Sequence, residues 1–324
     1  MFMPTAPFDA VLLVAFGGPQ GPDDVRPFLE NVLRGRRVSP ERIEEVAHHY
    51  DRFGGVSPIT AFTMQQAAGL EAALAARGLS LPVHVGMRNW HPYLADTLTQ
   101  MSGAGVRRAI GVLAAAQRSY SGCLQYKENV RDARVAVRAA GTRDVEVVYV
   151  GDWHAHPGFI EANADHVRQA FDRLPSDRRD VARLIFTAHS IPTTMAASYP
   201  YETQLRESAQ RIATACGRTD WELVYQSRSG RPGDPWLEPD VCHYLRTARI
   251  DAAVLCPVGF LCDHVEVLYD LDVEAADVCR TLDIAMERAE AVNAHPRFID
   301  ALADTVADTW TRYRGGRPIP IAAS

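Results

Sequence analysis

Short apolar runs, often rich in β-branched residues, alternate along the chain with longer segments that are apolar on one side only. The short runs predict buried strands at 9–16, 82–87, 108–115, 145–150, 182–188, 221–226 and 252–260. The longer segments predict amphipathic helices, for example at 63–78, 158–174 and 201–217. Strands that alternate with helices are typical of βαβ units, so the predicted fold class is α/β with parallel sheets.

Loop-forming residues interrupt this pattern at 116–122 (AQRSYSG) and at 227–240 (SRSGRPGDPWLEPD). Seven or eight strands can form one wide sheet or two smaller ones, and a break near residue 118 predicts two similar α/β lobes. In open parallel sheets, ligands bind outside the carboxyl ends of the strands. The residues at those ends are therefore the candidates for function.

The 324-residue chain is 47% hydrophobic and 23% charged, which is ordinary for a globular protein of one or two domains. Its net charge of −6 argues against nucleic acid as the main partner, because phosphate binding needs a basic surface. Apolar runs are too short for a membrane span, and the first basic residue is Arg26, so no signal peptide is expected. The six cysteines form no CxxC pair and favour reduced thiols in the cytoplasm.

The segment 263–279 carries six carboxylates and neither Lys nor Arg. Three of them, Glu266, Asp270 and Glu274, are spaced by four residues, so a helix would place them on one face. Like charges at that spacing destabilise a helix by about 0.2–0.5 kcal/mol per pair. One explanation is a solvated outer face, with Asp263 as the cap of the helix. The other is a metal-handling cleft, because the opposite face is apolar and divalent cations favour carboxylate ligands.

Two other strand ends carry candidate groups. The strand at 182–188 leads into TAHSIP, where His189 is a structural histidine, a metal ligand or a proton acceptor near neutral pH. The first strand ends in AFGGP, which lacks the GxGxxG pattern of a dinucleotide site. That turn either simply needs a glycine with positive φ, or lets a ligand approach the backbone with Phe16 as an apolar wall.

Arginines gather in the segment LRGRRVSPER, at the end of a predicted helix. Arg34, Arg36 and Arg37 either form a solvated turn or bind ligand carboxylates or phosphates through their guanidinium groups. Aromatic and hydroxyl side chains elsewhere complete the candidates: Tyr50, Ser57 and Tyr126.

Five motifs, in this order, resemble the ferrochelatase family, and the resemblance extends from about residue 9 to 313. They are FGGP (16–19), HYDRFGGVSPIT (49–60), TAHSIP (187–192), YQSRSGRPGDPWLEPD (225–240) and PVGFLCDHVEVLYDLD (257–272). The resemblance implies two Rossmann-like lobes with a porphyrin cleft between them. The first lobe would comprise 7–118 plus a returning helix at 288–316, and the second would comprise 119–287.

The resemblance also implies the chemistry, which is insertion of Fe²⁺ into a porphyrin that loses two N–H protons. His189 and Glu266 match the catalytic residues on opposite sides of the cleft, and both are candidate metal ligands. Asp270 and Glu274 match an acidic row that brings iron toward the macrocycle. Fe²⁺ is then a substrate, and no permanently bound cofactor is expected.

The closest resemblance is to compact bacterial enzymes that act on coproporphyrin III and lack a membrane-binding lip. It gives as substrate-binding candidates Phe16, Arg34, Tyr50, Ser57 and Tyr126. Ser57 and Tyr126 match positions that contact propionates, whereas Phe16 stands where relatives often have a tyrosine ligand to iron. Leu33 and His49 stand where arginines are common, so the propionate contacts differ in this chain.

Many relatives hold a [2Fe–2S] cluster through one internal and three C-terminal cysteines. Here Cys123 matches the internal position, but no cysteine follows Cys279, so no cluster is expected. The expected partners are porphyrin and Fe²⁺, with no nucleic acid and no membrane, and the protein is expected to be a monomer. The alternatives are a protoporphyrin IX ferrochelatase, a cobalt chelatase and a tetrapyrrole carrier without chemistry. Asn89 and Gln117 argue against the cobalt enzyme, in which histidines are usual near the metal.

Overall fold

The computed structural model describes residues 6–35, 38–230 and 233–315. Arg36 and Arg37 of the arginine segment, residues 231–232 of the loop motif and residue 316 of the predicted first lobe lie outside this range. Within it, no helix combines the length and the apolar character needed to cross a membrane.

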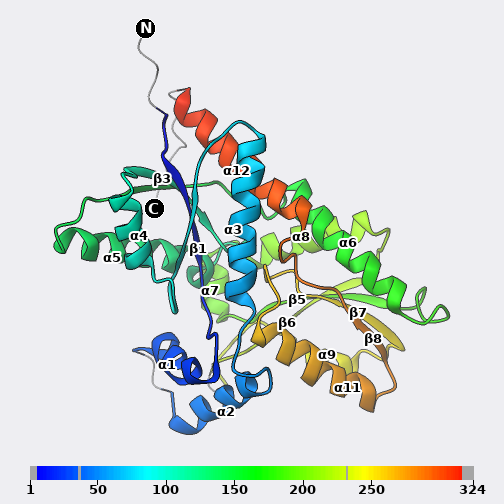
Figure 1. The fold of residues 1–324 in the computed structure, drawn as a ribbon. Coiled ribbons are helices and arrows are strands. Elements are labelled where there is room, and N and C mark those ends of the chain that lie inside the picture. The colour runs from blue at the N-terminus through cyan, green and yellow to red at the C-terminus, as the bar shows by residue number, and fades with distance from the viewer. Residues whose placement is uncertain (1–5, 36–37, 231–232, 316–324) are drawn as a thin grey trace.

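Two four-stranded parallel sheets form the framework (Figure 1). The first sheet has the order β2-β1-β3-β4 and the second has the order β6-β5-β7-β8. The strands are β1 (Ala10–Ala15), β2 (Val83–Met87), β3 (Arg108–Leu113), β4 (Glu146–Tyr149), β5 (Arg183–His189), β6 (Trp221–Gln226), β7 (Ala252–Cys256) and β8 (Ala285–Arg288).

The predicted α/β class with two lobes is confirmed, and each of the seven predicted strands is present within a few residues. The sequence patterns did not indicate β8. This strand lies at the edge of its sheet, and its four residues are all only half-buried, so its sequence (AMER) has no continuous apolar run. A weak hydrophobic signal is expected from such an edge strand.

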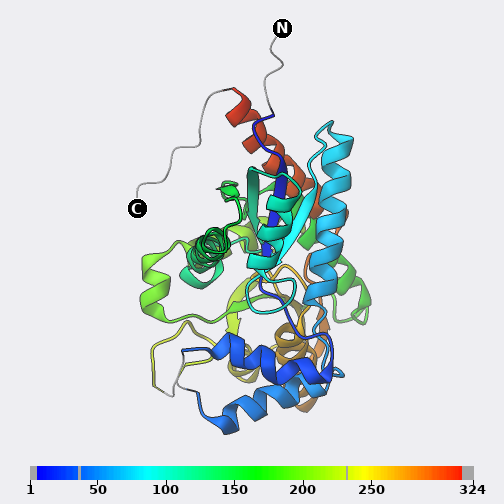
Figure 2. The ribbon, with the colours of Figure 1, turned by 60° about the vertical axis from the view of Figure 1, so that its left-hand side comes forward.

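Helices cover both faces of each sheet (Figures 1 and 2). One face of the first sheet packs on α3 and α12, and its other face packs on α4 and α5. The second sheet has α6 and α8 on one face and α9, η2 and α11 on the other. The helices are α1 (Pro22–Leu33), α2 (Pro40–Asp51), α3 (Ile59–Ala76), α4 (Leu94–Gly103), η1 (Tyr120–Leu124), α5 (Gln125–Ala139), α6 (Pro157–Arg173), α7 (Thr193–Ser198), α8 (Tyr201–Ala215), α9 (Val241–Thr247), α10 (Val265–Val267), η2 (Leu268–Ala275), α11 (Ala276–Thr281) and α12 (Pro296–Arg314).

The last helix of each half packs on the sheet of the other half. Helix α6 follows β4 of the first sheet but contacts β7 and β8 of the second, and α12 follows β8 but lies beside α3 on the first sheet (Figure 1). The Arg77 guanidinium of α3 donates to Asp304 of α12 at 2.9 Å. Phe159 of α6 and Phe298 of α12 meet edge to face in the shared core, with their ring centroids 6.1 Å apart.

The strand pairing differs from the predicted lobe boundary at 118/119. Strand β4 pairs with β3, and α5 packs on the same sheet, so residues 119–149 belong with the first sheet. The segment AQRSYSG suggested a boundary because it is rich in loop-forming residues. In the structure it is the connection between β3 and α5 within one lobe.

Candidate functional site

The candidate residues lie at the carboxyl ends of the central strands of both sheets. Phe16 follows β1, His189 ends β5, and Glu266 follows the loop after β7. Positive φ at Gly17 (84°) lets the chain turn sharply after Phe16, as the AFGGP sequence suggested. This placement follows from the parallel topology, which brings the carboxyl ends of neighbouring strands to one edge.

His189 presents one ring nitrogen that is available for chemistry. Its Nδ1 lies 2.5 Å from the backbone carbonyl oxygen of Ser190, and a carbonyl can only accept, so Nδ1 carries the proton. The remaining nitrogen, Nε2, therefore keeps its lone pair in the neutral imidazole. A hydrogen bond of 3.0 Å from the Tyr201 hydroxyl to the His189 carbonyl oxygen anchors the backbone behind it.

His264 connects the two predicted catalytic residues electrostatically. Burial lowers the pKa of His264, the negative charge of Glu266 opposes that shift, and His189 adds to it. Both side chains therefore lie within electrostatic range of the same imidazole. The sequence analysis did not select His264, although it stands two residues before Glu266 in the motif that carried the resemblance.

The three evenly spaced acids lie on a continuous helical segment, most of which is a π-helix. Glu266 is in α10, and Asp270 and Glu274 are in η2, whose eight residues have the wider π-helical turn. The π-helix is rare and occurs frequently at functional sites. A helix was predicted here, but its type was not, because spacing by four residues is compatible with both.

Asp270 is held by the end of β6. The amide of Gln226 donates to its Oδ2 at 3.1 Å, and the Ser227 hydroxyl donates to the same oxygen. Burial raises the pKa of Asp270 to about 7, against the effect of the Ser227 hydrogen bond and with a contribution from the charge of Glu266. Burial also raises the pKa of Glu274. The Asp270 carboxylate therefore changes its charge near neutral pH.

The six carboxylates of this segment divide into two sets. This division explains how so many acids can lie close together in the sequence. The first set is neutralised from elsewhere in the chain: Arg288 pairs with Asp263 at 2.7 Å and Asp272 at 2.6 Å, and Arg280 pairs with Asp277 at 2.7 Å. The second set is the evenly spaced one: Glu266, Asp270 and Glu274. In the part of the chain that the structure describes, no Arg, Lys or His nitrogen forms an ion pair with these three.

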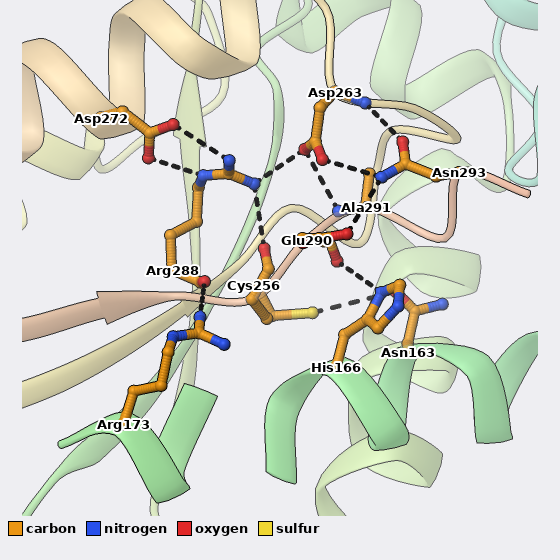
Figure 3. A network of polar contacts seen from close by, with 11 residues as sticks. Asn163, His166, Arg173, Cys256, Asp263, Asp272, Arg288, Glu290, Ala291 and Asn293 are labelled. Atoms are coloured by element: carbon orange, nitrogen blue, oxygen red, sulfur yellow. Dashed lines mark hydrogen bonds and ion pairs between the residues drawn. The ribbon is translucent and has the colours of Figure 1, made fainter. Parts of the chain in front are cut away.

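Asp263 was expected to cap the helix, but it does not. The residue at the N-cap position of α10 is His264, which makes no capping hydrogen bond, and the Asp263 carboxylate turns inward (Figure 3). It accepts from Arg288 at 2.7 Å and from the Asn293 amide at 2.9 Å. The ion pair with Arg288 and the hydrogen bond from Asn293 outweigh the weaker helix-capping interaction.

The acidic helix contacts the α1–α2 hairpin of the first lobe. The imidazole of His49 stacks on the phenol of Tyr269 with a centroid distance of 3.6 Å and an interplanar angle of 10°. Burial and, to a smaller extent, the charge of Glu266 raise the pKa of Tyr50, which lies on the same hairpin. The predicted residue Tyr50 is therefore close to Glu266, although 216 positions separate them in the sequence.

On the first lobe, an arginine lies between two of the predicted substrate-binding residues. The guanidinium carbon of Arg88, directly after β2, is 5.6 Å from the ring centroid of Phe16 and 5.1 Å from that of Tyr126. Burial raises the pKa of Tyr126 to about 12, and the positive charge of Arg88 opposes that shift. Arg88 was missed because nothing in its local sequence marks it. Only the folded arrangement of β1, β2 and α5 brings Arg88 between Phe16 and Tyr126.

The other two substrate-binding candidates lie at different depths. Ser57 is buried against Gly18, where an added Cβ would come within 2.7 Å of the Ser57 Cβ. Arg34 is exposed at the end of α1 and donates to the Asn31 side chain at 2.5 Å. Arg34 therefore presents a cation at the surface of the hairpin, whereas Ser57 lines the turn after β1.

Gln117 and Arg118 make contacts between the two lobes. The buried amide of Gln117 donates to the Ser208 hydroxyl at 3.4 Å and to the Val258 carbonyl at 3.5 Å, which links the first lobe to the second. The backbone N–H of Arg118 donates to the Gln204 side chain at 2.7 Å, and its guanidinium pairs with Asp152 at 3.3 Å. These residues therefore join the two lobes.

Within the described ranges, no group of three or more His, Cys, Asp or Glu side chains gathers in the manner of a metal-holding cluster. The acids instead form a row along one helix, starting at Glu266 and passing Asp270 to Glu274. The carboxylates and the His189 Nε2 are hard or borderline donors of the kind that first-row divalent metals accept.

Comparison with known proteins identifies the family. The ferrochelatase family model matches residues 8–309. A ferrochelatase from Rhodopirellula baltica is 48% identical over 306 residues, which cover 93% of this chain and 86% of that protein. A coproporphyrin III ferrochelatase from Streptomyces coelicolor is 45% identical over 335 residues, which cover 98% and 89%.

The solved structure of a sirohydrochlorin chelatase from Bacillus subtilis subspecies spizizenii, in complex with cobalt, shares the fold. Its TM-score is 0.57 at 12% identity, and the match covers 94% of this chain and 97% of that chain. At this identity the likeness concerns the two-lobed architecture alone. The family model and the relatives carry the assignment, and the chain belongs to the ferrochelatase family.

Proposed function

We propose that this protein inserts Fe²⁺ into coproporphyrin III. The observation that carries the choice of substrate is the close similarity to coproporphyrin III ferrochelatases. Those from Streptomyces coelicolor and Mycolicibacterium smegmatis are 45% and 44% identical, and each alignment covers 98% of this chain. The geometry at the strand ends supports the reaction.

Insertion exchanges two pyrrole N–H protons of the free-base porphyrin for one Fe²⁺. The site must therefore supply a proton acceptor on the macrocycle and a route for a cation. His189 suits the first role, because its Nδ1–H is engaged by the Ser190 carbonyl and its Nε2 lone pair is available. In this proposal Nε2 accepts the two pyrrole protons one after the other and passes each of them to solvent.

Glu266, Asp270 and Glu274 suit the second role. They are carboxylates in a row without an ion-paired cation among the described residues, so an incoming Fe²⁺ relieves their mutual repulsion. Asp270 accepts two hydrogen bonds, which orient its carboxylate and keep it partly ionised near pH 7. We infer that iron passes from Glu274 toward Glu266 and enters the macrocycle there.

The first lobe supplies surfaces for the porphyrin. Phe16 offers an apolar wall for the ring, and Arg34 and Arg88 offer guanidinium groups to propionate carboxylates. We also assign Tyr50, Ser57 and Tyr126, which are buried side chains of the first lobe, to the binding of the porphyrin. We further infer that the enzyme works as a monomer in the cytoplasm, where its six unpaired cysteines stay reduced.

The test is anaerobic Fe²⁺ insertion followed by absorbance, with coproporphyrin III and protoporphyrin IX compared side by side. We expect turnover of coproporphyrin III with a kcat/KM at least tenfold higher than that for protoporphyrin IX. A preference for protoporphyrin IX would overturn the substrate, and faster insertion of Co²⁺ than Fe²⁺ would overturn the metal. Tight binding of both porphyrins without turnover would instead indicate a carrier.

A further inference from the structure

Arg288 lies outside the row of acids but contacts two other acids of the same segment, Asp263 and Asp272. This residue ends β8, and its guanidinium lies between Asp263, before the helix, and Asp272, within it (Figure 3). Glu266 and Asp270 lie between these two points in the sequence. One side chain therefore holds the loop at one end of the acidic row and the π-helix farther along it.

The contacts to Asp272 are those of a two-pronged pair. Arg288 Nε donates to Oδ1 at 2.6 Å, and Nη2 donates to Oδ2 at 3.0 Å. Two parallel hydrogen bonds between a planar guanidinium and a carboxylate fix both distance and orientation. The third nitrogen, Nη1, donates to Asp263 Oδ1 at 2.7 Å. Lysine has no planar fork and cannot reproduce this three-point contact.

Arg288 and Asp263 are in turn held in place by neighbouring residues. The Arg173 guanidinium of α6 donates to the backbone carbonyl of Arg288 at 2.6 Å. Asp263 and Asn293 form a reciprocal pair, in which the Asp263 N–H donates to Asn293 Oδ1 at 2.9 Å and the Asn293 amide donates to Asp263 Oδ2 at 2.9 Å. The Gln66 amide of the first lobe donates to the Asn293 carbonyl at 2.8 Å, so the support reaches both lobes.

The burial of Arg288 and Asp263 indicates that their contact is rigid. The side chains of Arg288 and Asp263 are only 13% and 10% exposed, whereas that of Asp272 is 38% exposed. Charges of this kind leave water only when their partners are well placed. The two exposed acids of the row, Glu266 and Glu274, have no comparable support of their own in the described chain.

We propose that Arg288 is a positioning residue, which sets the place of Glu266 and Asp270 by clamping Asp263 and Asp272 on either side of them. The inference rests on the proposed function, because it assigns the clamp to the delivery of Fe²⁺. Porphyrin binding on the first lobe should not depend on it. A displacement of about 1 Å at reacting groups can lower a rate 10²-fold, so a loosened clamp has a measurable effect.

The test compares two substitutions of matched charge and location, Asp272→Asn and Asp277→Asn. Both acids lie on the same helical segment and pair with an arginine, but the partner of Asp277 is the exposed Arg280. We expect Asp272→Asn to lower kcat/KM for Fe²⁺ about tenfold and to leave the coproporphyrin III Kd, measured by fluorescence quenching, within twofold. Asp277→Asn should change neither quantity by more than twofold.

Hydrogen–deuterium exchange of the peptide spanning 264–275 supplies a readout that does not depend on turnover. We expect faster exchange there in Asp272→Asn and in Arg288→Lys, and no change in Asp277→Asn. Equal exchange in all three variants, or full activity in Arg288→Lys, would overturn the clamp. Failure of the wild-type protein to insert iron would count against the proposed function instead, and the exchange comparison would still decide whether Arg288 positions the helix.

Discussion

The two lobes share one backbone plan and carry opposite chemistry. Both sheets are parallel and have equivalent strand orders, and each is covered by helices on both faces. Beyond the strand ends, however, the second lobe presents His189 and a row of acids, whereas the first presents Phe16 and Arg88, with Tyr126 of α5 beside Arg88. The shared fold therefore determines where functional side chains lie, and the residues beyond each strand determine their chemistry.

In the proposed function, the second lobe carries the proton and iron chemistry and the first lobe binds the porphyrin. Substitutions on the two lobes should therefore separate in the kinetics. Changes in the second lobe should act on kcat and on the KM for Fe²⁺, and changes in the first lobe should act on the KM for the porphyrin.

The largest effect is expected for His189→Ala. Removal of a general base typically costs 10²–10⁴-fold, so we expect kcat for Fe²⁺ insertion to fall about 10³-fold. Porphyrin affinity, measured by fluorescence quenching, should stay within twofold, because the substitution leaves the first lobe intact. A parallel loss of porphyrin affinity would mean that the lobes do not divide the work in this way.

Asp270→Asn should separate stability from activity. Burial raises the pKa of Asp270 to about 7 in the folded protein, whereas the unfolded chain has an ordinary value near 4, so the folded state retains a proton between these pH values. This group therefore contributes less to stability as pH rises through that window, and the penalty is complete above about pH 7. The asparagine variant should gain about 1–3 kcal/mol at pH 8 and nothing at pH 4.

Thermal unfolding at pH 4 and pH 8, with Asp277→Asn as the control, measures this difference. The same variant should lose Fe²⁺ affinity, which appears as a higher KM for the metal. If Asp270→Asn were no more stable than the wild type at pH 8, the carboxylate would be ionised without cost, and its position in the row would not strain the fold.

The junction between the lobes should respond to Gln66→Met. The Gln66 amide donates to the carbonyl oxygens of Leu261 and Asn293 at 3.2 Å and 2.8 Å, and methionine would leave both without this donor. We expect a loss of about 1–2 kcal/mol in the free energy of unfolding, measured with urea. Gln210→Met, at an exposed position on α8, should change it by less than about 0.5 kcal/mol. Equal losses in the two variants would exclude a special role for Gln66.

The smallest effect is expected for Arg34→Gln on the first lobe. The residue is exposed, so its substitution should not alter stability, and we expect the KM for coproporphyrin III to rise about fivefold, or about 1 kcal/mol, with kcat unchanged. Arg312→Gln, an exposed arginine in the last turn of α12, serves as the control. A rise in the KM for Fe²⁺ rather than for the porphyrin would contradict the assignment of Arg34.

Local features were predictable from the sequence because their causes are local. The apolar runs indicated seven strands, and the spacing by four indicated that Glu266, Asp270 and Glu274 share a helical face. The edge strand β8 and the π-helical turn were not predictable, since a half-buried strand has no strong pattern and the spacing fits two helix types.

Long-range pairing accounts for most of the rest. Arg288 neutralises Asp263 from 25 positions away, and nothing near either residue indicates the other. The stacking of His49 on Tyr269 likewise depends on how the lobes meet, and the insertion of Arg88 between Phe16 and Tyr126 depends on how β1, β2 and α5 come together within the first lobe. The lobe boundary was misplaced for the same reason, because only strand pairing assigns β4 to the first sheet.

The exchange of α6 and α12 between the sheets has a mechanical consequence. Each half of the molecule buries a helix that the other half supplies, and the aromatic rings of Phe159 and Phe298 meet at the crossing. Swinging the halves apart like a hinge would pull these helices from a shared core and expose it to water. We therefore expect the two halves to resist hinge opening. We expect a flat, stiff porphyrin to be admitted by local movement of the α1–α2 hairpin, whose apolar side chains pack in a smaller, separate cluster that also includes Val265 of α10.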